Sequence, residues 1–158
     1  MTFTSIRVDT SGFEEAERAL RGFTATMLDL RPFWPLLVPI FIRWMRTQFE
    51  SEGAWGGHKW APLTPAYAAW KAQHKPGRSI LVADGDMKAA ASRPSRQVAP
   101  HYMILSIVDP KIEYHQDGTP RMVARPVLPE HLPPQADDDI SDAANNYVRE
   151  NLKRFGLG

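Results

Sequence analysis

The architecture expected for this chain depends mainly on residues 35–50, PLLVPIFIRWMRTQFE. If this stretch forms a helix, its apolar side chains, including those of Trp44 and Phe49, surround much of the circumference of that helix. A helix that is apolar on most sides has to be buried on most sides. The sequence therefore predicts either a central core helix or a helix that forms part of a subunit interface, and both interpretations stay open. Pro39 is expected to kink this helix or delay its start.

The residues before this stretch predict a second helix, which Ser11 and Glu14 would open with the spacing of a capping box. An alternating gap of three and four residues predicts one stripe buried in the core. The stripe consists of Phe13, Ala16, Leu20, Phe23, Met27 and Leu30. A short strand is expected over residues 4–9.

Downstream, Thr64 and Pro65 are typical of a helix start and predict a helix over residues 65–74. Asp84-Gly85 predicts a turn, with a short helix capped by Asp86 after it. Residues 92–100 are expected to be a flexible loop.

The next segment is rich in strand-forming residues and predicts a strand over residues 101–108. Alternation at residues 111–115 places Ile112 and Tyr114 on one face of a further strand. Residues 122–128 could extend beside these strands, and Pro126 would restrict them to an edge or an arm.

A last helix is expected over residues 137–155, with aspartates at its start and Gly156 just after its end. Its apolar face would hold Ile140, Ala144, Tyr147, Val148, Leu152 and Phe155. The fold class is therefore α+β, a single domain with a small, mainly antiparallel sheet packed by long helices. Residues 1–129 would form the α+β core, with an extended arm near 119–129, and residues 130–158 a linker and the C-terminal helix.

The balance of 19 basic and 18 acidic residues gives a net charge of +1, which does not favour a duplex-DNA binder. Cysteine is absent, so disulfides and thiolate metal sites are excluded. Met1 to Asp9 lacks the pattern of a signal peptide, and the most apolar stretch, residues 33–42, is too short to span a membrane.

Catalytic signals are weak throughout the chain. None of the five histidines lies at metal-ligand spacing, and no nucleophile or phosphate-loop motif occurs. Asp84 and Asp86 could hold a cation, although a turn and a helix cap explain them better. We therefore expect no enzyme activity, cofactor or metal.

The order of several short motifs resembles the virion-morphogenesis (Mu G-like) tail-completion family of tailed bacteriophages and related neck proteins. The motifs are Phe49-Glu50, Gly53, Lys59-Trp60-Ala61-Pro62-Leu63-Thr64-Pro65, Tyr67, Lys71, Ile80-Leu81, Gly85-Asp86-Met87, Ser92, Tyr114-His115-Gln116-Asp117-Gly118 and Ala124-Arg125-Pro126-Val127-Leu128. The likeness covers residues 49–128 and the C-terminal helix.

The resemblance implies a structural subunit of the head–tail junction that completes the tail or joins it to the head. Its partners would be copies of itself in a hexameric ring, with a dodecamer as the alternative, and other neck, connector and tail-tube proteins. Non-specific contact with DNA in the lumen is expected, and no membrane. The location would be the virion, and the host cytoplasm during assembly.

The positions expected to serve assembly or to form the motifs are Trp44, Phe49, Trp60, Pro62, Leu63, Lys71, Leu81, Gly85, Met87, Tyr114, His115, Gly118, Arg125 and Pro126. Arg125 before Pro126 is held extended, which suits an arm that reaches a neighbour. The alternative function is a nucleic-acid-binding accessory protein. Its DNA-facing residues would be Lys71, Lys75, Arg78, Arg93 and Arg96.

Overall fold

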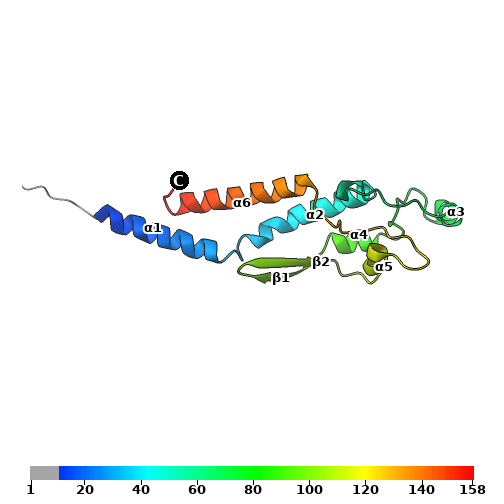
Figure 1. Ribbon diagram of the computed structural model, residues 1–158, viewed down its shortest axis with the longest axis horizontal. Helices are drawn as coiled ribbons and strands as arrows, with labels where there is room; N and C mark the ends of the chain where they lie inside the picture. The colour runs from blue at the N-terminus through cyan, green and yellow to red at the C-terminus, as the bar shows by residue number, and fades with distance from the viewer. Residues whose placement is uncertain (1–10) are drawn as a thin grey trace, which may run out of the picture.

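The computed structural model describes residues 11–158, which form an α+β fold of helices with one two-stranded sheet (Figure 1). The elements are α1 Ser11–Leu28, α2 Trp34–Glu50, the 3-10 helix η1 Ala54–Gly56, α3 Pro65–His74, α4 Asp86–Ala91, β1 Ser95–Ala99, β2 Tyr102–Ser106, α5 Lys111–Asp117 and α6 Pro134–Arg154. The strand predicted over residues 4–9 lies outside the described residues, as does the Ser11 side chain of the predicted capping box.

The described chain is elongated and has two unlike ends (Figure 1). We call residues 44–92 and 107–136 the packed end, because they hold the core cluster of Trp44, Met45, Phe49, Trp60, Val82, Met87, Ala91, Val127 and Ala136. We call α1, residues 34–43 of α2, residues 140–155 of α6 and the β1–β2 hairpin the helical end. Helix α2 joins the two ends (Figure 1).

Helix α6 begins in the core and runs back along α2 and then α1. Its first turn buries Ala136 completely, and Asp139 accepts a hydrogen bond from Trp44 Nε1 at 2.7 Å. Further along, the ring of Tyr147 lies 5.3 Å from that of Phe33. Predicted Gly156 is confirmed as the residue after the helix, with φ of 69°. There, Leu157 N–H donates to Leu152 O and Gly156 N–H to Lys153 O, which closes the last turn.

The sequence predicted α2 to be either a core helix or an interface helix, and the two halves of α2 differ in this respect. Its buried residues are Trp44, Met45, Gln48 and Phe49, all in the C-terminal half. In the N-terminal half, Leu36 and Pro39 are exposed, and the helix continues through Pro39. The C-terminal half is thus a core helix, whereas the N-terminal half has little cover within the described chain.

The prediction that the α1 stripe is buried in the core is wrong for its first half. Phe13 is 75% exposed and Leu20 is 54% exposed. Only the last turns of α1 are half-buried, where the end of α6 packs against them and the ring of Phe155 lies beside Gly22. The reason is geometric, because α6 reaches only that part of α1.

The segment predicted as a flexible loop, residues 92–100, contains β1 instead. Strand β1 pairs antiparallel with β2 from Ser95↔Ser106 to Ala99↔Tyr102, so the loop prediction is wrong. Four of its five residues are exposed, which leaves no apolar alternation for sequence analysis to detect. The strand predicted over residues 101–108 is confirmed as β2.

The alternation at residues 111–115 was misleading, because these residues begin helix α5. The Asp109 carboxylate accepts a hydrogen bond from Lys111 N–H at 2.8 Å and opens the helix. Ile112, His115 and Gln116 then face inward at helical spacing, while Tyr114 is exposed. The predicted strand over residues 122–128 is also wrong, since this segment forms only an isolated bridge between Thr119 and Met122.

The helix starts at Thr64 and Asp84-Gly85 agree with prediction. The Thr64 hydroxyl accepts a hydrogen bond from Tyr67 N–H at the start of α3. Helix α4 starts at Asp86, but its cap is Gly85 in the left-handed region, and the Asp86 side chain makes no capping bond.

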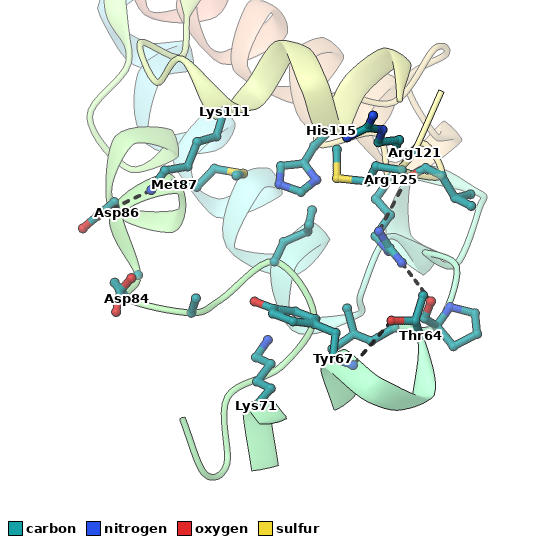
Figure 2. A pocket seen from close by; sticks show the side chains of 17 residues that line it. Thr64, Tyr67, Lys71, Asp84, Asp86, Met87, Lys111, His115, Arg121 and Arg125 are labelled. Carbon is teal, nitrogen blue, oxygen red and sulfur yellow. Dashed lines mark hydrogen bonds and ion pairs between the residues drawn. The ribbon is translucent and has the colours of Figure 1, made fainter. Parts of the chain in front are cut away.

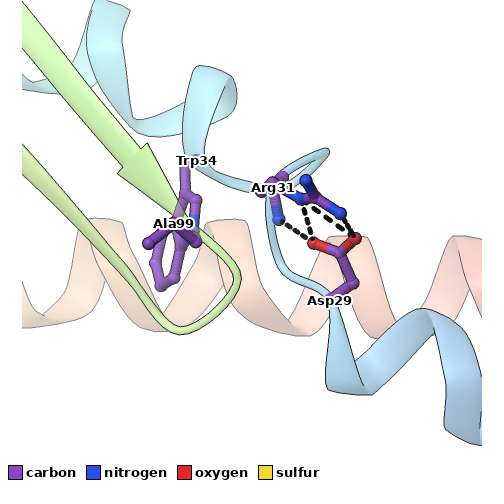
Figure 3. A network of polar contacts seen from close by, with 4 residues as sticks. All are labelled: Asp29, Arg31, Trp34 and Ala99. Atoms are coloured by element: carbon purple, nitrogen blue, oxygen red, sulfur yellow. Dashed lines mark hydrogen bonds and ion pairs between the residues drawn. The ribbon is translucent and has the colours of Figure 1, made fainter.

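The link between α1 and α2 is braced by the tip of the hairpin (Figure 3). Trp34 Nε1 donates to Ala99 O at 2.7 Å, and Leu30 N–H donates to Pro100 O at 2.9 Å. Within the link, Arg31 hydrogen-bonds the Asp29 carboxylate, which lowers the pKa of Asp29 to about 2. The hairpin therefore fixes the direction in which α1 leaves α2.

Candidate functional site: the motif groove

A groove of about 610 Å³ opens on the packed end (Figure 2). We call it the motif groove, because eight of the fourteen residues singled out by the sequence line it: Pro62, Leu63, Lys71, Leu81, Gly85, Met87, His115 and Arg125. The other lining residues are Thr64, Tyr67, Ala83, Asp84, Asp86, Lys111, Arg121, Met122 and Val123. The remaining six, Trp44, Phe49, Trp60, Tyr114, Gly118 and Pro126, lie outside it.

Behind the groove, Trp60 fastens two distant segments together. Its ring is buried and meets that of Phe49 edge-on at 5.5 Å. Its Nε1 donates to Pro126 O at 2.7 Å. A buried tryptophan whose N–H is satisfied is a strong anchor, so this side chain holds residues 60–63 against residues 125–128.

Arg125 completes this junction and corrects the prediction of an extended arm. The side chain is 7% exposed, and it donates from Nε to Ala61 O at 2.7 Å and from Nη2 to Pro62 O at 2.8 Å. Its backbone N–H donates to His115 O at 2.7 Å. Because its own chain uses these donors, Arg125 is not an arm that reaches out to a neighbour.

Gln116 and Gln48, which were not among the positions expected to serve assembly, clamp the same segment. Gln116 Oε1 accepts from Val127 N–H and Leu128 N–H, and its amide donates to Leu128 O at 2.7 Å. Gln48, 2% exposed, accepts from Gly56 N–H and donates to Pro126 O. A single glutamine on the apolar side of a core helix is a sequence signal that could have revealed Gln48.

Gly118 supports the clamp through close packing of the backbone. Its φ is 78°, and a Cβ there would lie 2.9 Å from both Ala124 N and Met122 O. A side chain at this position would push the segment away from α5.

Lys71 is a buried cation rather than a DNA-facing one, which corrects the sequence interpretation. It is 5% exposed, and its Nζ donates to Ser79 O at 2.5 Å. Burial lowers the pKa of Lys71, and the charge of Glu52 opposes that shift. The hydrogen bond ties α3 to the loop that carries Leu81.

Leu81 adopts a backbone conformation that leucine rarely takes, with φ of 60°. The Glu52 carboxylate accepts a hydrogen bond from Ile80 N–H at 3.0 Å, and Val82 N–H donates to Ser79 O at 3.1 Å. These bonds hold a strained turn whose side chain lines the groove. Strained residues of this kind cluster at binding sites.

His115 projects into the groove from α5 (Figure 2). Among the described residues, its buried Nδ1 has no hydrogen-bond partner. Burial and the nearby positive charge of Arg125 lower the pKa of His115, and Asp109 acts in the opposite direction. The groove thus contains a neutral imidazole with one unsatisfied polar atom.

The acidic residues at the rim are paired with lysines. Lys75 forms an ion pair with Asp84 and lowers the pKa of that carboxyl. Lys111 at the start of α5 lies 3.6 Å from Asp86 at the start of α4. Asp84 and Asp86 are therefore separate ion pairs rather than a joint carboxylate site. No group of His, Asp and Glu in residues 11–158 is placed to hold a metal ion.

The remaining predicted DNA-facing residues do not gather into one basic surface. Lys75 and Arg78 follow α3, whereas Arg96 lies on β1 with Arg93 just before it. Figure 1 places α3 and the hairpin in different parts of the molecule. The ion pair of Lys75 with Asp84 further reduces the charge near α3.

A search for known relatives found no family model, curated protein or solved structure that matches this chain. No helix in the described part of the chain is both long and apolar enough to cross a membrane. The motif groove combines an apolar lining with buried cationic groups, an arrangement suited to binding.

Proposed function

We propose that this chain is a structural subunit of the head–tail junction of a tailed bacteriophage, which acts by assembling with copies of itself and with neck, connector and tail-tube proteins. The observation that carries the proposal is the uncovered apolar stripe of α1. Phe13 and Leu20 present large side chains to solvent on one face. Contiguous exposed apolar surface of this kind marks protein interfaces.

The other face of α1 is charged, which supports a packed helix rather than an unstructured tail. Glu17 and Arg21 form an i,i+4 ion pair, and Arg18 donates to Glu14 O. Such pairs add little stability, so most of the stability of a helix of this length comes from packing its apolar face. Within the described chain, the first half of that face packs against nothing, and a second subunit would supply the cover.

The arrangement of the motif residues supports a structural role. The side chains of Trp60, Arg125 and Gln116 form hydrogen bonds with backbone atoms of their own chain. Their order along the chain is the basis of the family resemblance. We infer a closed ring, hexameric or dodecameric, because repeated contacts between unlike faces close in this way.

Light scattering of the purified chain over a concentration series, with electron microscopy of the largest species, tests the proposal. We expect a species of six or twelve times the 17.8 kDa chain mass. Leu20→Glu should abolish it and leave the helical circular dichroism signal of the packed end intact. The matched control is Arg21→Glu on the charged face. A chain that stays monomeric at every concentration, or a Leu20→Glu variant that still assembles, would contradict the proposal.

One observation favours the alternative of nucleic-acid binding. The exposed rings of Tyr67, Trp70 and His74 stack along α3 at centroid distances of 5.6 and 4.6 Å, just before Lys75 and Arg78. Bases stack on such platforms. However, Trp70 already stacks on two neighbouring rings, which a nucleic-acid base would have to displace or extend. We expect duplex-DNA binding no tighter than about 10⁻⁶ M near physiological salt, and a sequence-specific nanomolar complex would favour the alternative.

A further inference from the structure

We infer that the motif groove is a binding site for a peptide segment of another protein, in which an acidic side chain is flanked by apolar ones. The inference goes beyond ring assembly, because it assigns a binding function to the groove on the packed end, whereas ring assembly is proposed for the stripe on α1. It stands or falls independently of the proposed function.

The charge inside the groove identifies the acidic residue of the peptide. Lys71 and Arg125 are both more than nine-tenths buried and line the groove. Among the described residues, neither forms an ion pair with a carboxylate. Both donate only to backbone carbonyl groups. Buried charges are normally paired, so two cations without a carboxylate partner call for an incoming anion.

His115 adds a second polar group that awaits a partner. Its Nδ1 is buried and makes no hydrogen bond among residues 11–158. Figure 2 shows its ring directed into the groove between the Met87 side and the Arg125 side. A backbone N–H or carbonyl group of a bound peptide can satisfy this nitrogen in either tautomer.

The apolar lining points to a peptide rather than a small molecule. Met87 and Met122 supply flexible thioether side chains, which adapt to varied peptide side chains. At the mouth, Val123 is 64% exposed and Tyr67 is also exposed, so the apolar surface continues outside the groove. Small-molecule sites enclose most of their ligand, whereas a chain that crosses the mouth would cover these side chains.

The rim favours an acidic ligand as well. Lys75 and Lys111 are neutralised by Asp84 and Asp86. Arg121 lines the rim, is exposed and forms no ion pair within the described chain. An approaching acidic segment therefore meets a surface that is neutral or positive, which favours its association.

The first experiment selects peptides from a random octapeptide display library on the full chain. We expect the retained peptides to share an aspartate or glutamate between apolar residues. One of them, labelled with fluorescein, is then measured by anisotropy beside its twin with asparagine or glutamine at that position. The twin should bind at least about 30-fold more weakly, because it leaves the buried cations unpaired. Retained peptides without acidic residues would overturn the inference.

Two substitutions of Val123 test whether the peptide binds in the groove. Because Val123 is 64% exposed, both Val123→Asp and Val123→Lys should fold as the unmodified chain does. Val123→Asp should weaken binding of the acidic peptide about tenfold, and Val123→Lys should not weaken it. Equal affinities for the two variants would show that the peptide binds elsewhere. If no library peptide is retained, the inference is wrong, and a lower oligomer mass of Val123→Asp would then assign the groove to a second copy of the chain.

A second pair of variants separates a binding role of Lys71 from a structural one. We expect Lys71→Met to bind the peptide at least about 30-fold more weakly and to keep or raise the melting temperature, since it removes an uncompensated buried charge. Lys88→Met is the matched control, because Lys88 and its ion-pair partner Glu50 both lie outside the groove. A lower melting temperature with unchanged affinity would assign Lys71 to the fold alone.

Discussion

The packed end and the helical end use similar numbers of large apolar residues to different effect. At the packed end, Phe49 and Trp60 are buried in contact with each other, and polar clamps satisfy the backbone around them. At the helical end, Phe13 and Leu20 lie on one face of α1 with no cover from the described chain. Apolar spacing therefore identifies a face to be buried, but not whether the same chain buries it.

Two matched phenylalanine substitutions test the difference between the two ends most directly. Phe49→Ala removes a ring that is 1% exposed and should lower the free energy of unfolding by about 3–5 kcal/mol. Phe13→Ala, at 75% exposure, should change that of the monomer by no more than about 0.5 kcal/mol and should weaken self-association. Denaturant unfolding at low protein concentration measures both. Similar losses would mean that α1 is part of the core.

The elements that the sequence predicts correctly are those whose signals are local. Residues 35–50 and 65–74 were predicted as helices because their start signals, Pro35 and Thr64-Pro65, lie next to the residues that they affect. Strand β1 could not be predicted, since its exposed residues carry no periodic pattern and its pairing with β2 is the signal that matters. Helix α5 was missed because Ile112 and Tyr114 imitate a strand over too few residues to reveal the helical period.

The groove shows a related limit. The sequence identified Lys71, His115 and Arg125 as motif residues, and all three line the groove. The burial of Arg125 was not predictable from local pattern, because it depends on Ala61 and Pro62, which lie 64 and 63 residues away in sequence. The sequence predicted an arm at Arg125-Pro126, but the fold points the guanidinium of Arg125 inward.

A charge reversal at Arg125 tests whether this side chain belongs to the core of the packed end. Arg125→Glu would place a carboxylate beside the carbonyl oxygens of Ala61 and Pro62 in a buried position. We expect it to lower the free energy of unfolding by about 3 kcal/mol or more. Arg121→Glu, on an exposed residue of the same groove, is the matched control and should cost less than about 0.5 kcal/mol. A stable Arg125→Glu subunit that only fails to assemble would restore the arm interpretation.

The contact that joins the two ends should have a smaller effect. Asp139 on α6 accepts from Trp44 Nε1 at 2.7 Å and pairs with Arg43 at 2.6 Å. Asp139→Ala should lower the free energy of unfolding by about 1.5 kcal/mol, whereas the exposed Asp138→Ala should have little effect. The Trp44 bond lowers the pKa of Asp139, so this stabilisation is present above its ordinary pKa of 3.8 and is lost as pH falls through the lowered value. Equal thermal melts for the two variants would show that α6 is held by apolar contacts alone.

The smallest expected effect is the pH dependence contributed by His115. Burial and the charge of Arg125 lower the pKa of His115 below 6.5, so the unfolded chain binds this proton more readily than the folded one. Stability from this group is therefore full above pH 6.5 and declines as pH falls from there towards the lowered pKa of the folded state. Urea unfolding between neutral and mildly acidic pH measures the slope of the free energy of unfolding against pH.

His115→Gln should reduce this slope, and the exposed His131→Gln serves as the control for losing one histidine. Because His115 lies at the packed end, the Phe13→Ala variant, altered only at the helical end, should keep the slope of the unmodified chain. A slope that is unchanged in His115→Gln would mean that its imidazole is protonated as easily in the groove as in the unfolded chain, and the groove would then be wetter than its buried nitrogen implies.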